Sequence, residues 1–404
     1  MPANMNKILI LSILVIVVSF SLTMFVLSVF DEPKDTQTVQ SLEESQTTQK
    51  SSLIQTDDPN ARKILMQCNI DKHCYVEALW DLAEQAQDDD IVFGAVEEIM
   101  SNVQRAGFYC HTQAHHLGGF LYAYTKDLSQ ALSLADRKCG GSMYHGIVET
   151  YFLTEVVFEG ANVEEVEIVD LCDQVLDDSK SMIYLECVHG IGHGLAKSYD
   201  YDVFSAVKRC DEFETEDEQG FCYQGIFMEN GVEYLETEGG DYDENDLLYP
   251  CNKLELKYAS ACYYYHTTYL LNKTKSVKEA FQLCDGLDGE KQIQNCYLGI
   301  GRQLSILSND IEVLSQYCDL GDPKYQSLCF VGVVIVVADQ HGLDKAFETC
   351  QTFPEKFKTN CYLFMGTWIS KLNLTPEQIN DECKKAGDVE NYKACLKFAF
   401  NDSQ

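Results

Sequence analysis

Four segments of the chain repeat one pattern, namely CYQGIFMENG (222–231), CYLGIGRQL (296–304), CFVGVVIVVAD (329–339) and CYLFMGTWIS (361–370). Each begins with a cysteine and an aromatic residue, and its apolar residues return at spacings of three and four, which is typical of helices. A second amphipathic segment, such as SVKEAFQLC (276–284) or GLDKAFETC (342–350), ends on the next cysteine. The pattern therefore predicts repeated hairpins, with a helix A after one cysteine and a helix B that ends at the next.

The cysteines pair along the chain with a regular period. From Cys172 onward, 10 to 14 residues separate the members of a pair, and the first members recur every 32 to 41 residues, a period typical of solenoids. We expect each disulfide to join the end of a helix B to the start of the next helix A, and closing such a loop is worth about 3 kcal/mol. The predicted bridges are Cys172–Cys187, Cys210–Cys222, Cys251–Cys262, Cys284–Cys296, Cys318–Cys329, Cys350–Cys361 and Cys383–Cys395. They would stabilise an elongated array whose units touch only their neighbours.

The amino-terminal units are irregular. Cys68 and Cys74 fit a shortened version of the same bridge. Cys110 begins one helix and Cys139 ends the helix that returns beside it, so a bridge between them is expected. The alternative is that Cys110, next to His111, is a thiolate ligand of a metal.

At the level of this plan the chain resembles the secreted, cysteine-rich members of the tetratricopeptide-like Sel-type repeat family. The resemblance covers residues 61–398, although the spacing between paired cysteines is longer here and the glycine and alanine pattern of the family is only partly present. It implies an α-solenoid with a concave face, and since such repeats usually serve protein contacts, a protein partner on that face. We expect an all-α, right-handed superhelix of about nine hairpins, with irregular histidine-rich units in 61–205, regular units in 206–398 and a tail in 399–404.

The start of the chain predicts a membrane anchor. Residues 8–30 form an apolar run of 23 residues, long enough to cross a bilayer and longer than the apolar part of a cleaved signal peptide. Lys7 precedes the run and Asp31 and Glu32 follow it, which leaves residues 1–7 in the cytoplasm and the rest outside. The even number of cysteines agrees with an oxidising compartment. Residues 31–60, poor in apolar and aromatic residues, are predicted to be a disordered linker.

The charge of the chain excludes one class of partner. With 64 acidic against 30 basic residues, the formal net charge is −34. Binding a nucleic-acid backbone requires clustered lysine and arginine, so no nucleic-acid partner is expected.

Histidines in three successive units share one register. His111 and His115, His145 and Glu149, and His189 and His193 are each four residues apart, so each pair lies on one face of a helix. If the three helices pack side by side in chain order, these six side chains form one stripe of metal-ligand type, with His145 and Glu149 in the middle. Each imidazole would then reach only the gap beside its own helix. The glycines at 118, 119, 146, 190, 192 and 194 would permit close helix contact.

The stripe has two interpretations. The simpler one is that these histidines are packing residues bonded to tyrosines and carbonyls. The matching positions in later units are apolar or uncharged except Arg302, however, so the repeat itself does not require the stripe, and we expect a metal site. Imidazole suits zinc, copper or iron, and nearby Met143 and Met228 favour copper slightly. The sequence thus predicts a metal-binding protein, with a metal-dependent oxidoreductase or hydrolase as one possibility and a metal-free scaffold as the alternative. His116 is a spare ligand, and His73, His266 and His341 fall outside the register.

Overall fold

The described part of the chain consists of helices and connecting loops. The structure is a computed structural model that describes residues 56–68, 72–86, 88–106, 110–173, 182–308, 310–372 and 374–400. Within those ranges there is no β-strand beyond an isolated bridge between Asp243 and Asp246, so the all-α prediction is confirmed. None of the helices in these ranges is both long and apolar enough to cross a bilayer, and the predicted anchor at 8–30 and leader at 1–7 lie outside them.

From α6 onward there are two kinds of helix, which alternate except that no B helix separates α8 from α9 or α11 from α12. The longer A helices are α6 (Cys110–Thr125), α8 (Ser142–Tyr151), α9 (Met182–Ser198), α11 (Glu216–Thr237), α12 (Leu256–Lys273), α14 (Glu290–Leu307), α16 (Gln326–His341), α18 (Glu355–Ser370) and α20 (Val389–Ala399). The shorter B helices are α7 (Leu128–Leu134), α10 (Val203–Cys210), α13 (Val277–Asp285), α15 (Ile311–Cys318), α17 (Leu343–Thr352) and α19 (Pro376–Lys384). Three helices precede them, α3 (Pro59–Cys68), α4 (Lys72–Ala86) and α5 (Asp89–Ala106).

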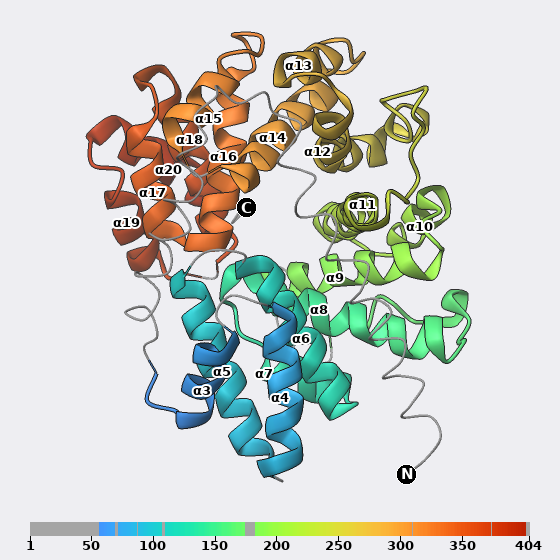
Figure 1. Cartoon of the computed structure of the whole chain (residues 1–404). Coiled ribbons are helices and arrows are strands. Elements are labelled where there is room, and N and C mark those ends of the chain that lie inside the picture. The colour runs from blue at the N-terminus through green and yellow to red at the C-terminus, as the bar shows by residue number, and fades with distance from the viewer. Residues whose placement is uncertain are drawn as a thin grey trace, which may run out of the picture.

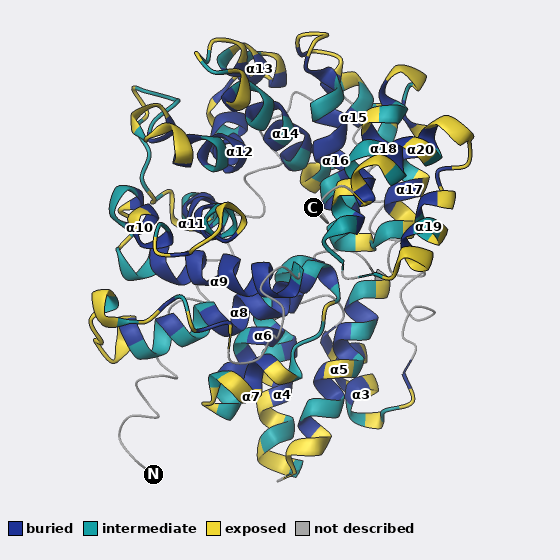
Figure 2. Ribbon diagram, turned by 180° about the vertical axis from the view of Figure 1, so that it is seen from behind, coloured by how far each residue is buried: buried dark blue, intermediate teal, exposed yellow. Residues whose placement is uncertain are grey.

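The ends of the B helices follow from local sequence. Side chains of Asp202, Ser276, Asp310 and Thr375 accept hydrogen bonds from backbone N–H groups in the first turns of α10, α13, α15 and α19. Such caps satisfy donors that a helix start leaves unpaired, and each is worth about 1 kcal/mol. The apolar residues of each B helix then pack against the A helices on either side, and Figure 2 shows the buried residues concentrated where the A helices face their neighbours.

The disulfides join the pairs that the sequence spacing predicted. All eighteen cysteines lie in described residues and form nine bridges, with Cα–Cα separations between 5.3 and 6.0 Å. The bridge between Cys110 and Cys139 removes the alternative in which Cys110 is a thiolate ligand. One detail of the prediction was wrong, because the second cysteine lies inside helix A and not before it. In α11 the helix already starts at Glu216, where Thr215 and Glu218 cap each other, and Cys222 lies in its second turn.

The array closes on itself, which corrects the expectation of an elongated solenoid whose units touch only their neighbours. Consecutive A helices pack side by side from α6 to α20, but α16 also contacts α5, α6 and the short 3-10 helix η4 (Cys139–Gly141). Figure 1 shows the result as a closed curve of helices, in which α16 comes back to the amino-terminal helices. A second contact across this closure is the ion pair between Lys371 Nζ and Asp217 Oδ2, at 2.8 Å.

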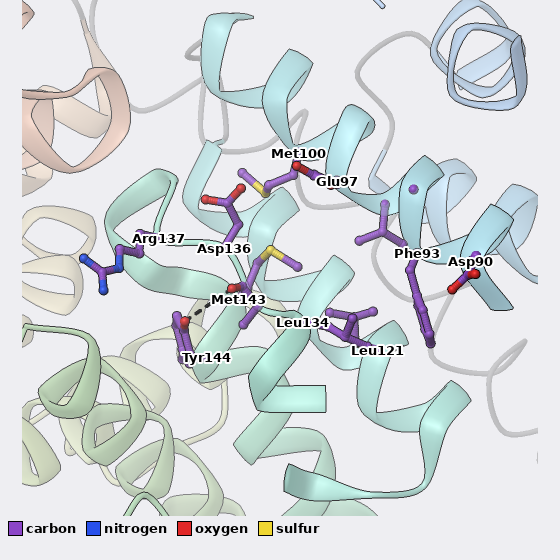
Figure 3. Close-up of a pocket in the computed structure, with 13 residues that line it drawn as sticks. Asp90, Phe93, Glu97, Met100, Leu121, Leu134, Asp136, Arg137, Met143 and Tyr144 are labelled. Atoms are coloured by element: carbon purple, nitrogen blue, oxygen red, sulfur yellow. Dashed lines mark hydrogen bonds between the residues drawn. The ribbon is translucent and has the colours of Figure 1, made fainter. Parts of the chain in front are cut away.

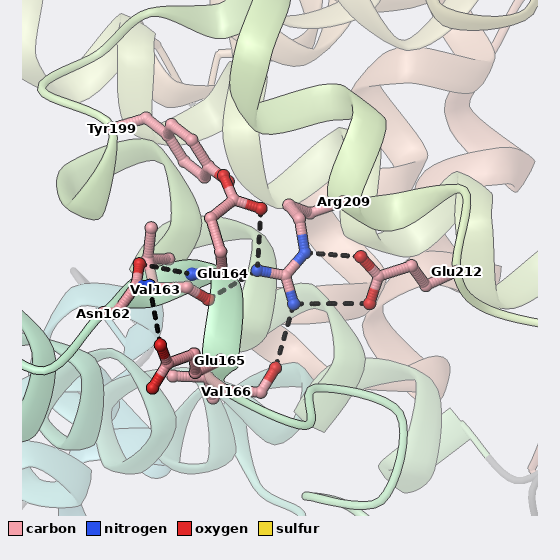
Figure 4. A network of polar contacts seen from close by, with 8 residues as sticks. All are labelled: Asn162, Val163, Glu164, Glu165, Val166, Tyr199, Arg209 and Glu212. Atoms are coloured by element: carbon pink, nitrogen blue, oxygen red, sulfur yellow. Dashed lines mark hydrogen bonds and ion pairs between the residues drawn. The ribbon is translucent and has the colours of Figure 1, made fainter.

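A buried arginine fixes the loop between α8 and α9. After α8 the chain continues as a π-helix, η5 (Phe152–Phe158), and then as the 3-10 helix η6 (Val163–Glu165). Arg209 at the end of α10 is 6% exposed, and its guanidinium donates to the carbonyl oxygens of Val163 and Val166 while it pairs with Glu212 (Figure 4). These bonds satisfy a charge that would be costly to bury alone, and they hold the loop against α10.

Glycines allow the A helices to approach one another closely. A Cβ atom on Gly225 of α11 would lie 2.0 Å from the carbonyl oxygen of His189 in α9, and one on Gly192 of α9 would lie 2.2 Å from that of Cys222. Gly118 and Gly146 make the same kind of contact between α6 and α8. The predicted role of the glycines in close helix contact is therefore confirmed at these positions.

Substituting one of these glycines should therefore destabilise the protein. We expect Gly225→Ala to lower the free energy of unfolding by about 3 kcal/mol, because the new methyl group meets a backbone atom that cannot move alone. Gly94→Ala in α5 is the matched control, since nothing lies within 4 Å of its added Cβ. It should stabilise the helix by up to about 1 kcal/mol. Urea unfolding measures both, and equal effects would contradict the contact.

The closed arrangement also depends on the disulfide pairing. We expect peptide mapping of the non-reduced protein to recover the nine neighbouring bridges and no others. A bridge that skips units, such as one between Cys172 and Cys284, would contradict the order of the hairpins.

Candidate metal centre

The three helices that carry the predicted ligands pack in chain order. Helix α8 contacts both α6 and α9, so His145 and Glu149 lie between the other two pairs as predicted. Below, the histidine cluster means His111, His115, His145, His189 and His193. The rings of His145 and His189 have centroids 4.5 Å apart, and those of His189 and His193 are 4.9 Å apart.

The cluster is more compact than the predicted stripe. The rings of His115 on α6 and His193 on α9 lie 5.3 Å apart, although α8 separates their helices. The expectation that each imidazole reaches only the gap beside its own helix was therefore wrong. Gly146 explains the contact, because a Cβ there would lie 1.8 Å from the carbonyl oxygen of His115. Because α8 is held so close to α6, the side chains of His115 on α6 and His193 on α9 meet across it.

In three of these rings, one nitrogen is bonded to an acidic or hydroxyl side chain. His193 Nδ1 lies 2.7 Å from Glu229 Oε2, and His145 Nε2 forms a hydrogen bond with Glu186 Oε2. His111 Nδ1 lies 2.7 Å from Ser142 Oγ. It is also 3.2 Å from the Oδ2 atom of Asp339, which α16 brings from across the ring closure.

The other nitrogen of each of these rings is buried and has no hydrogen-bond partner. This holds for His111 Nε2, His145 Nδ1 and His193 Nε2, and also for His189 Nε2. One nitrogen bonded to a carboxylate and the other left for an ion is the usual arrangement of histidine ligands in metal proteins, because the carboxylate fixes the ring and its tautomer. His115, His145 and His193 each offer a nitrogen, and these atoms lie within 4.8 Å of one another.

A second group of possible metal ligands is already paired with the ammonium group of a lysine. Glu149, His193 and Glu229 also bring ligand atoms within 4.8 Å of one another. Lys197 Nζ, however, lies 3.2 Å from Glu149 Oε1 and 2.5 Å from Glu229 Oε1. Its ammonium group therefore already pairs with both carboxylates, and the three-histidine group is the better candidate for a metal.

The electrostatics of the cluster favour the neutral form of three of its imidazoles. Burial lowers the pKa of His115, His145 and His189 well below the ordinary value, and their mutual proximity adds to the effect. Burial raises the pKa of Glu186, with a further contribution from Asp339, so both partners of the His145–Glu186 pair favour the uncharged form.

Glu149 shows the opposite balance. Burial, the largest single cause, would raise its pKa, but the charges of Lys197, His115 and His193 together outweigh burial and lower the pKa to about 2. Glu149 thus stays ionised beside His115, with Oε2 at 3.2 Å from His115 Nδ1.

Several residues of the centre were not identified from the sequence. They are Glu186, Lys197, Glu229, Arg302 and Asp339. Lys197 continues the face of His189 and His193 by one more helical turn, and Glu186 lies three residues before His189, so helical spacing contained a signal for both. Glu229 is one position beyond the register of the stripe, and Asp339 reaches the cluster only because the array closes.

One of the two methionines that favoured copper lies away from the histidine cluster. Met143 is two residues before His145, so the two side chains leave α8 on different faces. Figure 3 shows Met143 with Met100 in a cavity of about 510 Å³ that α5, α6 and the segment before α8 help to form. Met143 therefore gives no support for copper.

The remaining histidines differ from the cluster. His266 is buried at 3% exposure, its Nε2 bonds the carbonyl oxygen of Leu247 at 2.6 Å, and its ring stacks on Tyr242. Neither of its ring nitrogens is left buried without a partner, which is what a packing role produces. His341 at the end of α16 is exposed, and the side chain of His73 lies outside the described residues. His116 is on α6 next to His115, but it does not belong to the three-histidine group.

The buried His266 predicts acid sensitivity of the fold. Burial lowers its pKa to about 4, from an ordinary value near 6.5, although the bond to Leu247 opposes the shift. Between these pH values the unfolded chain takes up a proton that folded His266 does not, so stability falls as the pH falls. The contribution of this residue should lower the free energy of unfolding by about 3 kcal/mol.

His266→Gln should therefore flatten the dependence of the unfolding free energy on pH between about 6.5 and 4, measured by urea unfolding. Because burial also lowers the pKa of His115, His145 and His189, the difference between variant and parent is the informative quantity. Parallel curves would contradict the assigned shift.

Comparison with known proteins identified no relative for this chain. The resemblance to Sel-type repeats therefore stays a prediction, and the functional interpretation rests on the geometry of the histidine cluster. No family model matches the sequence, and no curated protein or solved structure is significantly similar to it.

Proposed function

We propose that this protein binds a transition-metal ion in the histidine cluster. His115, His145 and His193 are the primary ligands, since their nitrogens already lie within 4.8 Å of one another. His111, His189 and Glu149 are neighbours that complete the coordination or hold the ligands in place. Three imidazoles about a tetrahedral zinc ion would stand about 3.3 Å apart, so binding requires side-chain adjustments on the order of 1 Å.

The observation that carries this proposal is that histidines of the cluster have a buried ring nitrogen without a hydrogen-bond partner. A histidine that only packs satisfies both nitrogens or leaves one in water, as His266 does. Four nitrogens of the cluster, two of them on the primary ligands His145 and His193, are instead buried and unpaired, and each unsatisfied buried polar atom costs about 1 to 3 kcal/mol. A metal ion removes that cost for the nitrogens that bind it.

The charges around the cluster also favour a cation. Glu149, Glu186, Glu229 and Asp339 are four carboxyl groups in contact with the histidines, and Lys197 is the one cation that pairs with any of them among the described residues. A divalent ion would reduce this imbalance, and it would also favour the ionised form of Glu186.

The ligand set restricts the metal and its chemistry. Nitrogen ligands suit zinc, copper or iron. Three protein ligands leave a position open for water or substrate, as in catalytic metal sites, so a metal-dependent hydrolase or oxidoreductase is the enzyme class that fits. A metal-free scaffold that binds a protein partner on its concave face is the alternative.

The compartment is a further part of the proposal. Nine disulfides suit an oxidising environment outside the cytoplasm. We propose that the helical domain, with a right-handed course of its hairpins, is held at the outer face of the membrane by the segment 8–30.

Metal content provides the direct test with variants. Protein purified without an affinity tag should contain about one transition-metal ion per chain by plasma mass spectrometry. His145→Ala combined with His193→Ala should abolish it, because two of the three primary ligands are lost. His341→Ala, the matched control, should retain it.

The scaffold alternative predicts another pattern. In that case the double variant would change only stability, with no metal in the parent protein. Circular dichroism shows whether the double variant keeps its helices, as the disulfides should ensure. A folded double variant with the metal content of the parent protein would contradict the proposed site.

A further inference from the structure

Arg302 lies near the histidine cluster and is separated from His189 by the ring of Tyr265. It belongs to α14, and its guanidinium carbon is 4.6 Å from the ring centroid of Tyr265 and 5.8 Å from that of Tyr264. The Tyr265 ring is in turn 6.4 Å from the ring of His189. The arginine is thus positioned by aromatic faces next to the proposed metal centre.

This arginine has no counter-ion within the part of the chain that the structure describes. Among the described residues it forms neither an ion pair nor a hydrogen bond, although acidic residues outnumber basic ones by 34 in the whole chain. Its side chain is only partly exposed. Arg209 shows the ordinary solution in this protein, where two carbonyls and a carboxylate satisfy the guanidinium.

The position is also specific to this unit of the repeat. Arg302 occupies the place in its A helix that His193 occupies in α9, six residues after the second cysteine of its pair. In the other regular units from Cys222 to Cys361, that place holds Met228, Thr268, Ile335 or Thr367. An unpaired guanidinium in this register therefore has no packing role that the repeat requires.

We infer that Arg302 is the anion-recognition group of the proposed metal site, and that the site takes a small monocarboxylate as substrate or co-ligand. This inference rests on the proposed function. A guanidinium presents a fork of N–H donors that matches a carboxylate, and such pairs are among the strongest hydrogen bonds in proteins. A single negative charge fits better than two, because four carboxyl groups already surround the cluster and Arg302 offsets one charge.

The ligand would extend from Arg302 to the metal. Its carboxylate pairs with Arg302, while an oxygen atom takes the open position on the metal. The side chains of His111 and His115 are partly exposed, so the cluster is open to solvent at α6.

Binding of acetate and glycolate to Co²⁺-loaded full-length protein tests the inference. The visible spectrum of the cobalt ion should change on titration with at least one of these anions, and ethylene glycol, which is uncharged, should have no effect. Arg302→Gln should weaken the anion at least tenfold and leave the Co²⁺ content unchanged. Lys324→Gln is the matched control for loss of a positive charge, since Lys324 is exposed and pairs with Glu290 away from the cluster.

The outcomes separate the two proposals. Failure of the parent protein to bind Co²⁺ would contradict the metal site and this inference together. A loaded protein whose spectrum responds to neither anion, or an Arg302→Gln variant that binds them as tightly as the parent, would overturn the inference alone.

Discussion

The close backbone contact of α6, α8, α9 and α11 is the constraint on which the centre depends. Gly146 and Gly225 place helix backbones so near that any side chain there would meet a carbonyl oxygen at about 2 Å. Only at this spacing can His115 and His193 extend from separate helices and meet above the one between them. The disulfides join residues near the ends of these helices. They therefore hold the hairpins in place close to the points where the glycines bring the backbones together.

The surroundings of the cluster give each histidine a defined orientation. Glu186 and Glu229 come from helix positions next to the ligand-bearing faces, and each holds one ring nitrogen. Lys197 links Glu229 to Glu149, which lies beside His115, so charges and hydrogen bonds connect two of the three primary ligands. A network of this kind restricts the rings before any ion binds, which lowers the cost of ordering them.

Sequence patterns could predict what depends on near neighbours. The helical period, the pairing of cysteines a dozen residues apart and the shared register of His111, His145 and His189 are local features, and the structure contains all of them. The closure of the array could not be predicted in this way, because it depends on small rotations that accumulate over many units. Asp339 reaches the cluster only through that closure, and Glu229 is one residue outside the register. The metal itself is not tested by the structure and stays a proposal.

The central claim is that imidazole nitrogens of the cluster hold a metal ion. X-ray absorption spectroscopy of protein purified without an affinity tag tests it most directly, because the spectrum reports both the element and its ligands. We predict a zinc, copper or iron edge with a first shell of nitrogen or oxygen near 2.0 to 2.1 Å, which is the distance for zinc, and the scattering pattern of at least three imidazoles. A shell dominated by sulfur, a pattern without imidazole, or no metal edge at all would contradict the account.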